Sequence, residues 1–291
     1  MRFISFTVEQ EERFGIWYEE ESIVVDLYCY YRDKGVDLPT LLSFIQAEDI
    51  NIEEMRGVSE AYHLSIQDVD LQAPIPSPLK NIFCVGKNYR DHAIEMGSEK
   101  DIPEHPMIFT KAPTSVSAPG KLLSFSKDVS EALDYEGELA VVIGKKGKRI
   151  SREQAMDYVF GYTIVNDITA RDLQKKHGQF FLGKSLDGSC PMGPAILHAS
   201  EVSNPHDFNL KTLVNGEVRQ NGHTSDLIFD IPELIHVLSK GMTLEPGDLI
   251  ATGTPSGVGK GFKPPKYLVD RDIVEVRIEG IGTLRNEISK R

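Results

Sequence analysis

Apolar and polar positions alternate or run together in short stretches of strand length along most of the chain. Continuous apolar runs at 139–143 and 163–165 are typical of strands that are buried on both faces. Further strands are predicted at 2–7, 14–18, 22–27, 81–85 and 249–251. Because strands outnumber helices and do not alternate with them regularly, the pattern disfavours a doubly wound fold and predicts a β-rich α+β protein.

The chain divides at a proline-rich segment. Residues 1–72 combine the first strands with two predicted helices, at 39–47 and 52–64, and form a small N-terminal α+β unit. Three alternating prolines favour an extended connector over 73–80. Residues 81–291 then form a larger, mainly β domain, so we expect two domains.

Local end signals predict the helices and one hairpin of this larger domain. Ser151 and Gln154 have the spacing of a capping box, which predicts a helix that begins at Ser151. A second helix is predicted to begin at Thr169, and a third to cover 232–240. Asn215-Gly216 predicts the tight turn of a β-hairpin.

Charge and composition exclude several classes of function. The 291 residues carry a net charge of −12, which argues against a nucleic acid or an anionic membrane as partner. No apolar run approaches the roughly 18–20 residues that a membrane span needs. The three cysteines are isolated and odd in number, which disfavours a disulfide framework and a thiolate zinc site. We therefore expect a cytoplasmic protein, which would need local cations or a metal to bind an acidic substrate.

Carboxylates gather at the ends of the two most apolar strands. Asp134, Glu136 and Glu138 precede the 139–143 run at every second position, so they project to the same side if the strand is continuous. Asp167 follows the 163–165 run at a corner between strand and helix. Asp134 suits a turn or a supporting position better than direct participation.

Glu136, Glu138 and Asp167 form a candidate metal site. Their hard oxygen atoms favour Mg²⁺ or Mn²⁺, are also compatible with Ca²⁺, and disfavour Zn²⁺. Three protein ligands would leave positions for substrate and water. The alternative is that the acids are solvated strand ends that face lysine or arginine.

His92 and Glu95 form a candidate general-base pair. They are three residues apart and therefore share a face if the segment is helical. A carboxylate that orients an imidazole fixes its tautomer and raises its basicity. The following segment, EMGSEKDIPEHP, is polar and could act as a lid. An exposed helix of mixed charges would have the same spacing.

Four other polar residues are candidates for contact with a substrate. Arg171 and Gln174 are three apart on the helix after Asp167, so both can point toward the acids. Lys184 lies in a segment without helical periodicity and could bind a carboxylate. Thr254 lies in a glycine-rich loop, where it could donate a hydrogen bond to a substrate carboxylate. For Arg171, a structural ion pair is an equal alternative.

The same glycine-rich loop does not match a nucleotide-binding loop. Lys260 is followed by Gly261, so the pattern G-x-x-x-x-G-K-[ST] is absent.

Several of these segments together resemble the fumarylacetoacetate hydrolase family. The likeness extends over residues 74–288, and the segments that carry it are GKNYRDHAIEMG, DYEGELAVVIG, NDITARDLQ, GKSLDGSCPMGP, VNGEVRQ and IATGTPSGVG. It implies a mixed β-sheet roll that forms a homodimer, with one Mg²⁺ or Mn²⁺ in each active site. The implied metal ligands are Glu136, Glu138 and Asp167.

The resemblance also implies roles for the remaining candidates. The implied catalytic residues are His92, Glu95 and Lys184. The implied substrate-binding residues are Arg171, Gln174, Lys184 and Thr254. The substrate would be a small anionic 2-oxo acid or dicarboxylate.

The resemblance leaves the reaction open among several chemistries. A divalent cation chelated by a 2-oxo acid acts as a Lewis acid and stabilises the enolate formed when a C–C bond breaks. Of the activities found in the similar bacterial branch, we expect oxaloacetate decarboxylation to pyruvate and CO₂. The alternatives are hydrolysis of acylpyruvates such as fumarylpyruvate or acetylpyruvate, and isomerisation of a 2-hydroxyhepta-2,4-diene-1,7-dioate type.

A role without catalysis is a further alternative. The protein would then be a metal-binding module whose N-terminal unit contacts a protein partner through Tyr28, Tyr30 and Tyr31.

Overall fold

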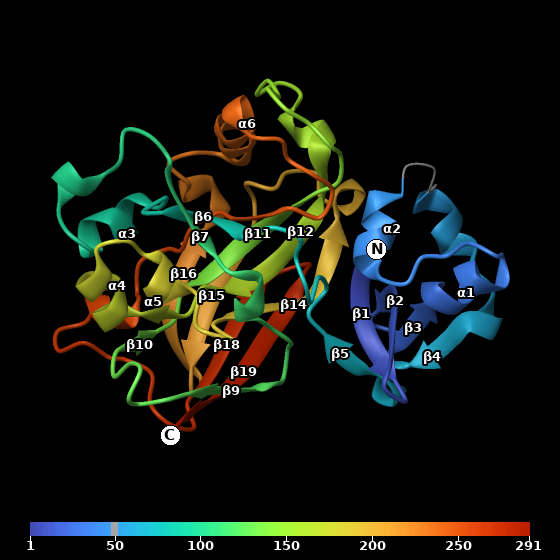
Figure 1. Cartoon of the computed structure of the whole chain (residues 1–291), viewed down its shortest axis with the longest axis horizontal. Coiled ribbons are helices and arrows are strands. Elements are labelled where there is room, and N and C mark those ends of the chain that lie inside the picture. Colours follow the sequence, from blue (N-terminus) through green and yellow to red (C-terminus); the bar gives the residue numbers. More distant parts are fainter. Residues whose placement is uncertain (48–51) are drawn as a thin grey trace.

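The computed structural model describes residues 1–47 and 52–291 (Figure 1). The N-terminal elements are β1 (Arg2–Val8), β2 (Glu11–Tyr18), β3 (Ile23–Asp26), α1 (Leu27–Asp33), α2 (Leu41–Gln46), β4 (His63–Ser65) and β5 (Asp70–Gln72). The helix predicted at 39–47 is confirmed as α2. The helix predicted at 52–64 is wrong, because this stretch forms short 3₁₀ turns and then β4.

Strands dominate the remainder of the chain. Its strands are β6 (Ile82–Gly86), β7 (Met107–Lys111), β8 (Val116–Ser117), β9 (Leu122–Phe125), β10 (Leu133–Asp134), β11 (Gly137–Ile143), β12 (Val159–Asn166), β13 (Thr169–Ala170), β14 (Cys190–His198), β15 (Asn209–Val214), β16 (Glu217–His223), β17 (Leu249–Ala251), β18 (Ile273–Ile278) and β19 (Gly282–Lys290). Its α-helices are α3 (Arg90–Glu95), α4 (Arg171–His177), α5 (Phe181–Lys184) and α6 (Ile231–Gly241). No helix in the described part of the chain is long and apolar enough to cross a membrane.

The local end signals predicted α6 and one hairpin turn correctly but predicted the helix from Ser151 wrongly. The helix predicted at 232–240 is confirmed as α6, which begins where Asp230 accepts a hydrogen bond from Glu233 N. The hairpin turn is confirmed, since Asn215 and Gly216 both have positive φ between β15 and β16. The helix predicted from Ser151 is wrong. A short 3₁₀ turn at Ala155–Tyr158 leads directly into β12, so the segment is too short for the hydrogen bonds of a helix to offset the unfavourable free energy of nucleation.

The described strands form two large sheets of mixed direction and one two-stranded sheet of β10 and β13, which confirms the predicted β-rich fold class. The larger sheet has the order β4-β3-β2-β1-β14-β12-β11-β17-β6-β7, and the smaller has the order β16-β15-β18-β19-β9. Most pairs are antiparallel, but β17 and β6 run parallel, as do β19 and β9. Apolar side chains from both sheets and from α6 form a shared core.

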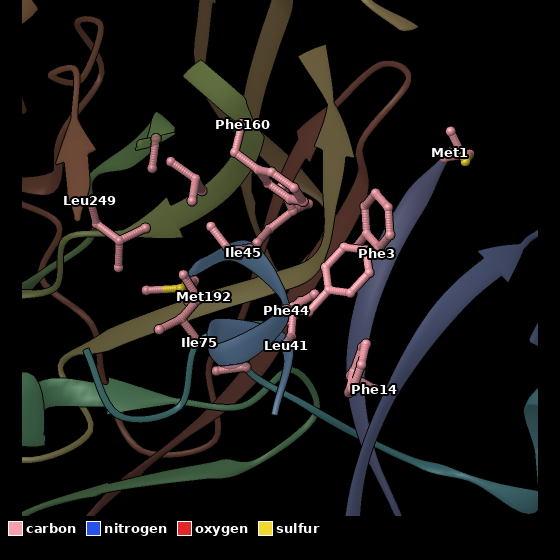
Figure 2. Close-up of a cluster of buried hydrophobic side chains, with 14 of the residues drawn as sticks. Met1, Phe3, Phe14, Leu41, Phe44, Ile45, Ile75, Phe160, Met192 and Leu249 are labelled. Atoms are coloured by element: carbon pink, nitrogen blue, oxygen red, sulfur yellow. The ribbon is translucent and has the colours of Figure 1, made fainter. Parts of the chain in front are cut away.

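The N-terminal strands extend the large sheet rather than forming a separate one. β1 pairs with β14, with Phe3 opposite Ile196. Figure 2 shows Phe3 beside Phe44 of α2 and Phe160 of β12, and both ring centroids lie 5.3 Å from that of Phe3. The division into domains at 73–80 stays a prediction. One hydrophobic cluster contains residues from both sides of this segment.

Sheet register brings four strand ends together at one edge. β11 and β12 are antiparallel, with Glu138 opposite Val165, so the start of β11 adjoins the end of β12. β17 is antiparallel to β11, and β6 is parallel to β17, so the ends of both also lie at this edge. The site described below lies here.

Candidate active site

Glu136, Glu138 and Asp167 lie together at this edge. One carboxylate oxygen from each lies within 4.8 Å of the others, and all three side chains are buried. Asp167 N donates a hydrogen bond of 2.8 Å to Glu136 O, which joins the end of β12 to the start of β11. Gly253 N donates to Glu138 Oε2 over 2.8 Å. The acids are therefore held by backbone contacts from three strand ends.

Two buried cations contact these acids. Lys184 Nζ lies 2.6 Å from both Glu136 Oε2 and Asp167 Oδ2, and Arg171 Nη2 lies 2.6 Å from Glu136 Oε1. Burial alone would raise the pKa of Glu136, but the charges of Lys184 and Arg171 outweigh it and hold this pKa well below the ordinary value. Burial, together with the charges of Asp167 and Glu136, raises the pKa of Glu138 well above the ordinary value.

Lys111 is a third buried cation, which the sequence analysis did not identify. Its Nζ lies 2.8 Å from Asp167 Oδ1. Its hydrogen bonds go instead to Ser189 Oγ and to the carbonyl oxygens of Ile168 and Lys184. Among the described residues, Asp167 Oδ1 therefore has an ionic neighbour but no hydrogen-bond partner. A lysine within the apolar 107–111 strand was the available signal, but only the fold shows where it points.

The expected continuous strand is wrong, because neither Asp134 nor Glu136 lies in the strand that carries Glu138. Leu133–Asp134 pairs with β13, and β11 begins only at Gly137. Asp134 accepts hydrogen bonds from Arg171 Nε at 2.8 Å and from Gly259 N at 2.7 Å. It supports the site by holding Arg171 and the 257–261 loop.

His92 and Glu95 lie on the short helix α3, at the same edge. His92 Nδ1 lies 3.2 Å from Glu95 Oε2, and Glu95 Oε1 accepts a hydrogen bond of 2.9 Å from Gly257 N. Glu95 is thus fixed by the glycine-rich loop and in turn orients the imidazole. His92 is buried, and it lines the cavity beside Glu136 and Glu138.

One cavity of about 280 Å³ brings His92 together with two of the acids, Glu136 and Glu138, and with the substrate candidates. The candidate residues that line it are His92, Glu136, Glu138, Arg171, Gln174, Lys184 and Thr254. Gln174 Oε1 accepts a hydrogen bond of 3.3 Å from Arg171 Nη1. Thr254 Oγ1 already donates to Gly137 O over 2.9 Å and accepts from Gln220 Nε2 over 2.7 Å. The roles of these residues toward a substrate stay predictions.

Helix ends at the site differ slightly from expectation. The helix predicted to begin at Thr169 begins at Arg171, because Thr169 pairs with Asp134 in a short strand. Lys184 ends the single turn α5, although its segment has no helical periodicity. Both changes leave Arg171 and Lys184 directed at Glu136.

The donor atoms fit a divalent cation. Three buried carboxylates offer only hard oxygen ligands, which Mg²⁺ and Mn²⁺ prefer. Asp167 Oδ1 lacks a hydrogen bond, and burial with the neighbouring acids raises the pKa of Glu138. A divalent cation would relieve both conditions.

Comparison with known proteins places the chain in a family. The family model for the fumarylacetoacetate (FAA) hydrolase C-terminal domain matches residues 81–289. The chain belongs to this family. The resemblance expected from the sequence segments is thereby confirmed.

Three relatives illustrate the range of the family. Oxaloacetate tautomerase YisK of Bacillus subtilis (strain 168) is 64% identical over 228 residues, which are 78% of this chain and 76% of that protein. The solved structure of fumarylacetoacetate hydrolase EaFAH from psychrophilic Exiguobacterium antarcticum is 42% identical, covers 100% of both chains and has a TM-score of 0.87. Maleylpyruvate hydrolase from Sphingobium sp. SYK-6, solved with manganese(II) and pyruvate, is 30% identical over 100% of this chain and 99% of that one, with a TM-score of 0.79.

Proposed function

We propose that the protein is a divalent-metal-dependent enzyme that moves a proton between the keto and enol forms of oxaloacetate. The carrying observation is that His92, held by Glu95, lines the same cavity as Glu136 and Glu138. The likeness to an oxaloacetate tautomerase supports this substrate and this reaction. Proton transfer is thus proposed in place of the C–C cleavage that was expected from the sequence.

The proposed metal is Mg²⁺ or Mn²⁺, held by Glu136, Glu138 and Asp167. When bound, it would supply a Lewis acid to the oxygens of the 2-oxo acid. Arg171 and Lys184, which contact the two carboxylate oxygens of Glu136, would neutralise the carboxylates and orient the substrate. The manganese and pyruvate in the related maleylpyruvate hydrolase support this part of the proposal.

His92 is the proposed proton carrier. Its Nδ1 faces the Glu95 carboxylate, so Nδ1 holds a proton and Nε2 is the nitrogen that exchanges one. His92 would remove a proton from C3 of the keto form to give the enolate, whose oxygen then takes up a proton from His92 or from solvent to give the enol, and the same steps in reverse would restore the keto form. General acid–base catalysis of this kind contributes roughly 10²–10⁴-fold in rate.

Decarboxylation of oxaloacetate to pyruvate and CO₂ is a second candidate. Loss of CO₂ leaves the same kind of enolate, and the buried cations Arg171, Lys184 and Lys111 would stabilise its charge. His92 would then only reprotonate the product.

Two further features complete the proposal. A homodimer in the cytoplasm is in keeping with the family resemblance and with Cys29, Cys84 and Cys190, which are all free thiols. The alternative of a protein-interaction module has less support. Tyr31 is buried, and the ring of Tyr30 packs against the rings of Tyr31 and Tyr62.

The test measures both reactions on one sample. Purified protein with Mn²⁺ is mixed with oxaloacetate, the ultraviolet absorbance of the enol reports tautomerisation, and pyruvate release reports decarboxylation. Blanks with Mn²⁺ alone and with the Glu136→Gln protein correct for catalysis by the free ion. Enol conversion well above both blanks supports the proposal. Pyruvate release without enol conversion favours the second candidate. If neither signal exceeds the blanks, both candidates are contradicted.

A further inference from the structure

Three lysines line the cavity beyond the residues used so far: Lys87, Lys175 and Lys260. Lys87 Nζ lies 3.6 Å from Asp101 Oδ1, so its charge has a partner. In the described parts of the chain, Lys175 and Lys260 have no acidic side chain within ion-pair distance. Both lysines are exposed at the cavity, where they add positive charge in a protein whose net charge is −12.

The backbone at Lys260 is tied to the catalytic centre. Lys260 N donates a hydrogen bond of 3.1 Å to Asp134 Oδ2, and Gly259 N donates one of 2.7 Å to Oδ1. The same Asp134 carboxylate accepts from Arg171 Nε over 2.8 Å. One buried carboxylate therefore sets the position of Lys260 relative to Arg171.

The loop is equally constrained on the side of the dyad. Gly257 N is bonded to Glu95 Oε1, and a Cβ at Gly261 would lie 2.2 Å from that same oxygen. Lys260 is thus carried by a loop that fits closely between Glu95 and Asp134. Its placement is part of the same arrangement that positions His92 and Arg171.

A charge balance shows that these lysines exceed what the metal and the first carboxylate need. Four buried acids (Asp134, Glu136, Glu138 and Asp167) face three buried cations (Lys111, Arg171 and Lys184). A divalent ion would leave one positive charge, which the carboxylate of a 2-oxo acid would neutralise. Lys175 and Lys260 then remain to attract a second anionic group.

We propose that Lys260, assisted by Lys175, binds the distal carboxylate of a 2-oxo dicarboxylic acid. The proposal rests on the function given above and deepens it by assigning residues to the distal carboxylate of the substrate. Burial and the Arg171 charge also hold the pKa of Lys260 below its ordinary value, which a bound carboxylate would offset. An ion pair to the distal carboxylate would favour its retention, because CO₂ loss removes the charge that the lysine binds. Lys260 would therefore favour proton transfer over decarboxylation.

Malate and lactate provide an unreactive test pair. Both are 2-hydroxy acids, and only malate carries the distal carboxylate. Calorimetry measures their dissociation constants with the Mn²⁺-loaded protein and with the Lys260→Gln, Lys175→Gln and Lys176→Gln variants. Lys176 is the matched control, since it is exposed on α4 beside Lys175 but does not line the cavity. The Lys260 backbone bonds to Asp134 need no side chain, so the Lys260→Gln variant keeps its loop contacts.

Lys260→Gln should weaken malate binding about tenfold or more and change lactate binding less than twofold. Lys175→Gln should weaken malate binding by a smaller factor, and Lys176→Gln should change neither constant. With oxaloacetate, Lys260→Gln should also raise the ratio of pyruvate formed to enol converted. If Lys260→Gln affects malate and lactate binding equally, or does not affect malate binding, the inference is overturned. Turnover of oxaloacetate by the wild-type protein would then still support the proposed function. A wild-type protein that binds neither acid and converts no oxaloacetate would overturn both.

Discussion

Arg171 Nη2 donates a hydrogen bond of 2.6 Å to Glu136 Oε1, with both side chains buried. The same guanidinium bonds Asp134 through Nε, so one arginine joins a candidate metal ligand to the loop that carries Lys260. Arg171 therefore ties the candidate metal site to the Lys260 loop at the cavity.

Replacing Arg171 by methionine should destabilise the fold by about 3–5 kcal/mol, because Asp134 and Glu136 would keep buried charges without their partner. Chemical denaturation of the metal-free protein measures the change in free energy of unfolding. Arg152→Met is the control. Its ion pairs with Asp230 and Glu233 are exposed and should be worth less than about 1 kcal/mol. Equal losses for the two variants would contradict the assigned role of Arg171.

Replacing His92 by alanine should lower enol conversion by roughly 10²–10⁴-fold if it carries the proton. Metal affinity should change little, because His92 is not among the three clustered acids. Glu95→Gln should cause a smaller loss, since the imidazole would remain but lose its charged partner. Stopped-flow absorbance gives the rates, and Mn²⁺ titration gives the affinity. Unchanged rates in His92→Ala would exclude the dyad from proton transfer.

Stabilisation by Mn²⁺ should increase with pH. Burial and the neighbouring acids raise the pKa of Glu138, so without metal the folded state favours the protonated form. Above the ordinary glutamate pKa of about 4.3 the unfolded chain ionises freely, and the metal-free fold loses stability as pH rises toward the raised value. The metal displaces that proton, so its effect is weaker at low pH.

Thermal unfolding at several pH values, with and without Mn²⁺, measures this effect. The increase in melting temperature caused by Mn²⁺ should be larger at pH 8 than at pH 6. Glu138→Gln should reduce both the increase and its pH dependence. An increase of the same size at every pH would show that Glu138 is ionised without the metal.

Replacing Phe3 by alanine should cost about 3–5 kcal/mol, because Phe3 fills the cluster between α2 and β12 (Figure 2). Phe181→Ala is the control, since 42% of Phe181 is exposed. Urea denaturation followed by near- and far-ultraviolet circular dichroism measures both. A single shifted transition is expected because β1 and β14 belong to one sheet. Two separate transitions would support independent folding of the domain predicted at 1–72.

The sequence by itself determined the features that depend on neighbouring positions. The acids at 136 and 138, just before the apolar run 139–143, indicated that carboxylates gather where this strand begins, and the spacing of His92 and Glu95 indicated a pair on one helical turn. The asparagine-glycine turn and α6 were equally local. In each case, the residues that decide the structure lie within a few positions of one another.

Only the tertiary structure decided which of these features meet. The break between Asp134 and Gly137 depends on pairing with β13, and the turn after Ser151 depends on how soon β12 begins. Lys111 and Lys260 reach the site from strands and loops far along the chain, positioned by sheet register and by the Asp134 carboxylate. Local periodicity specifies the face on which a side chain lies. The long-range pairing of strands determines which other side chains it contacts there.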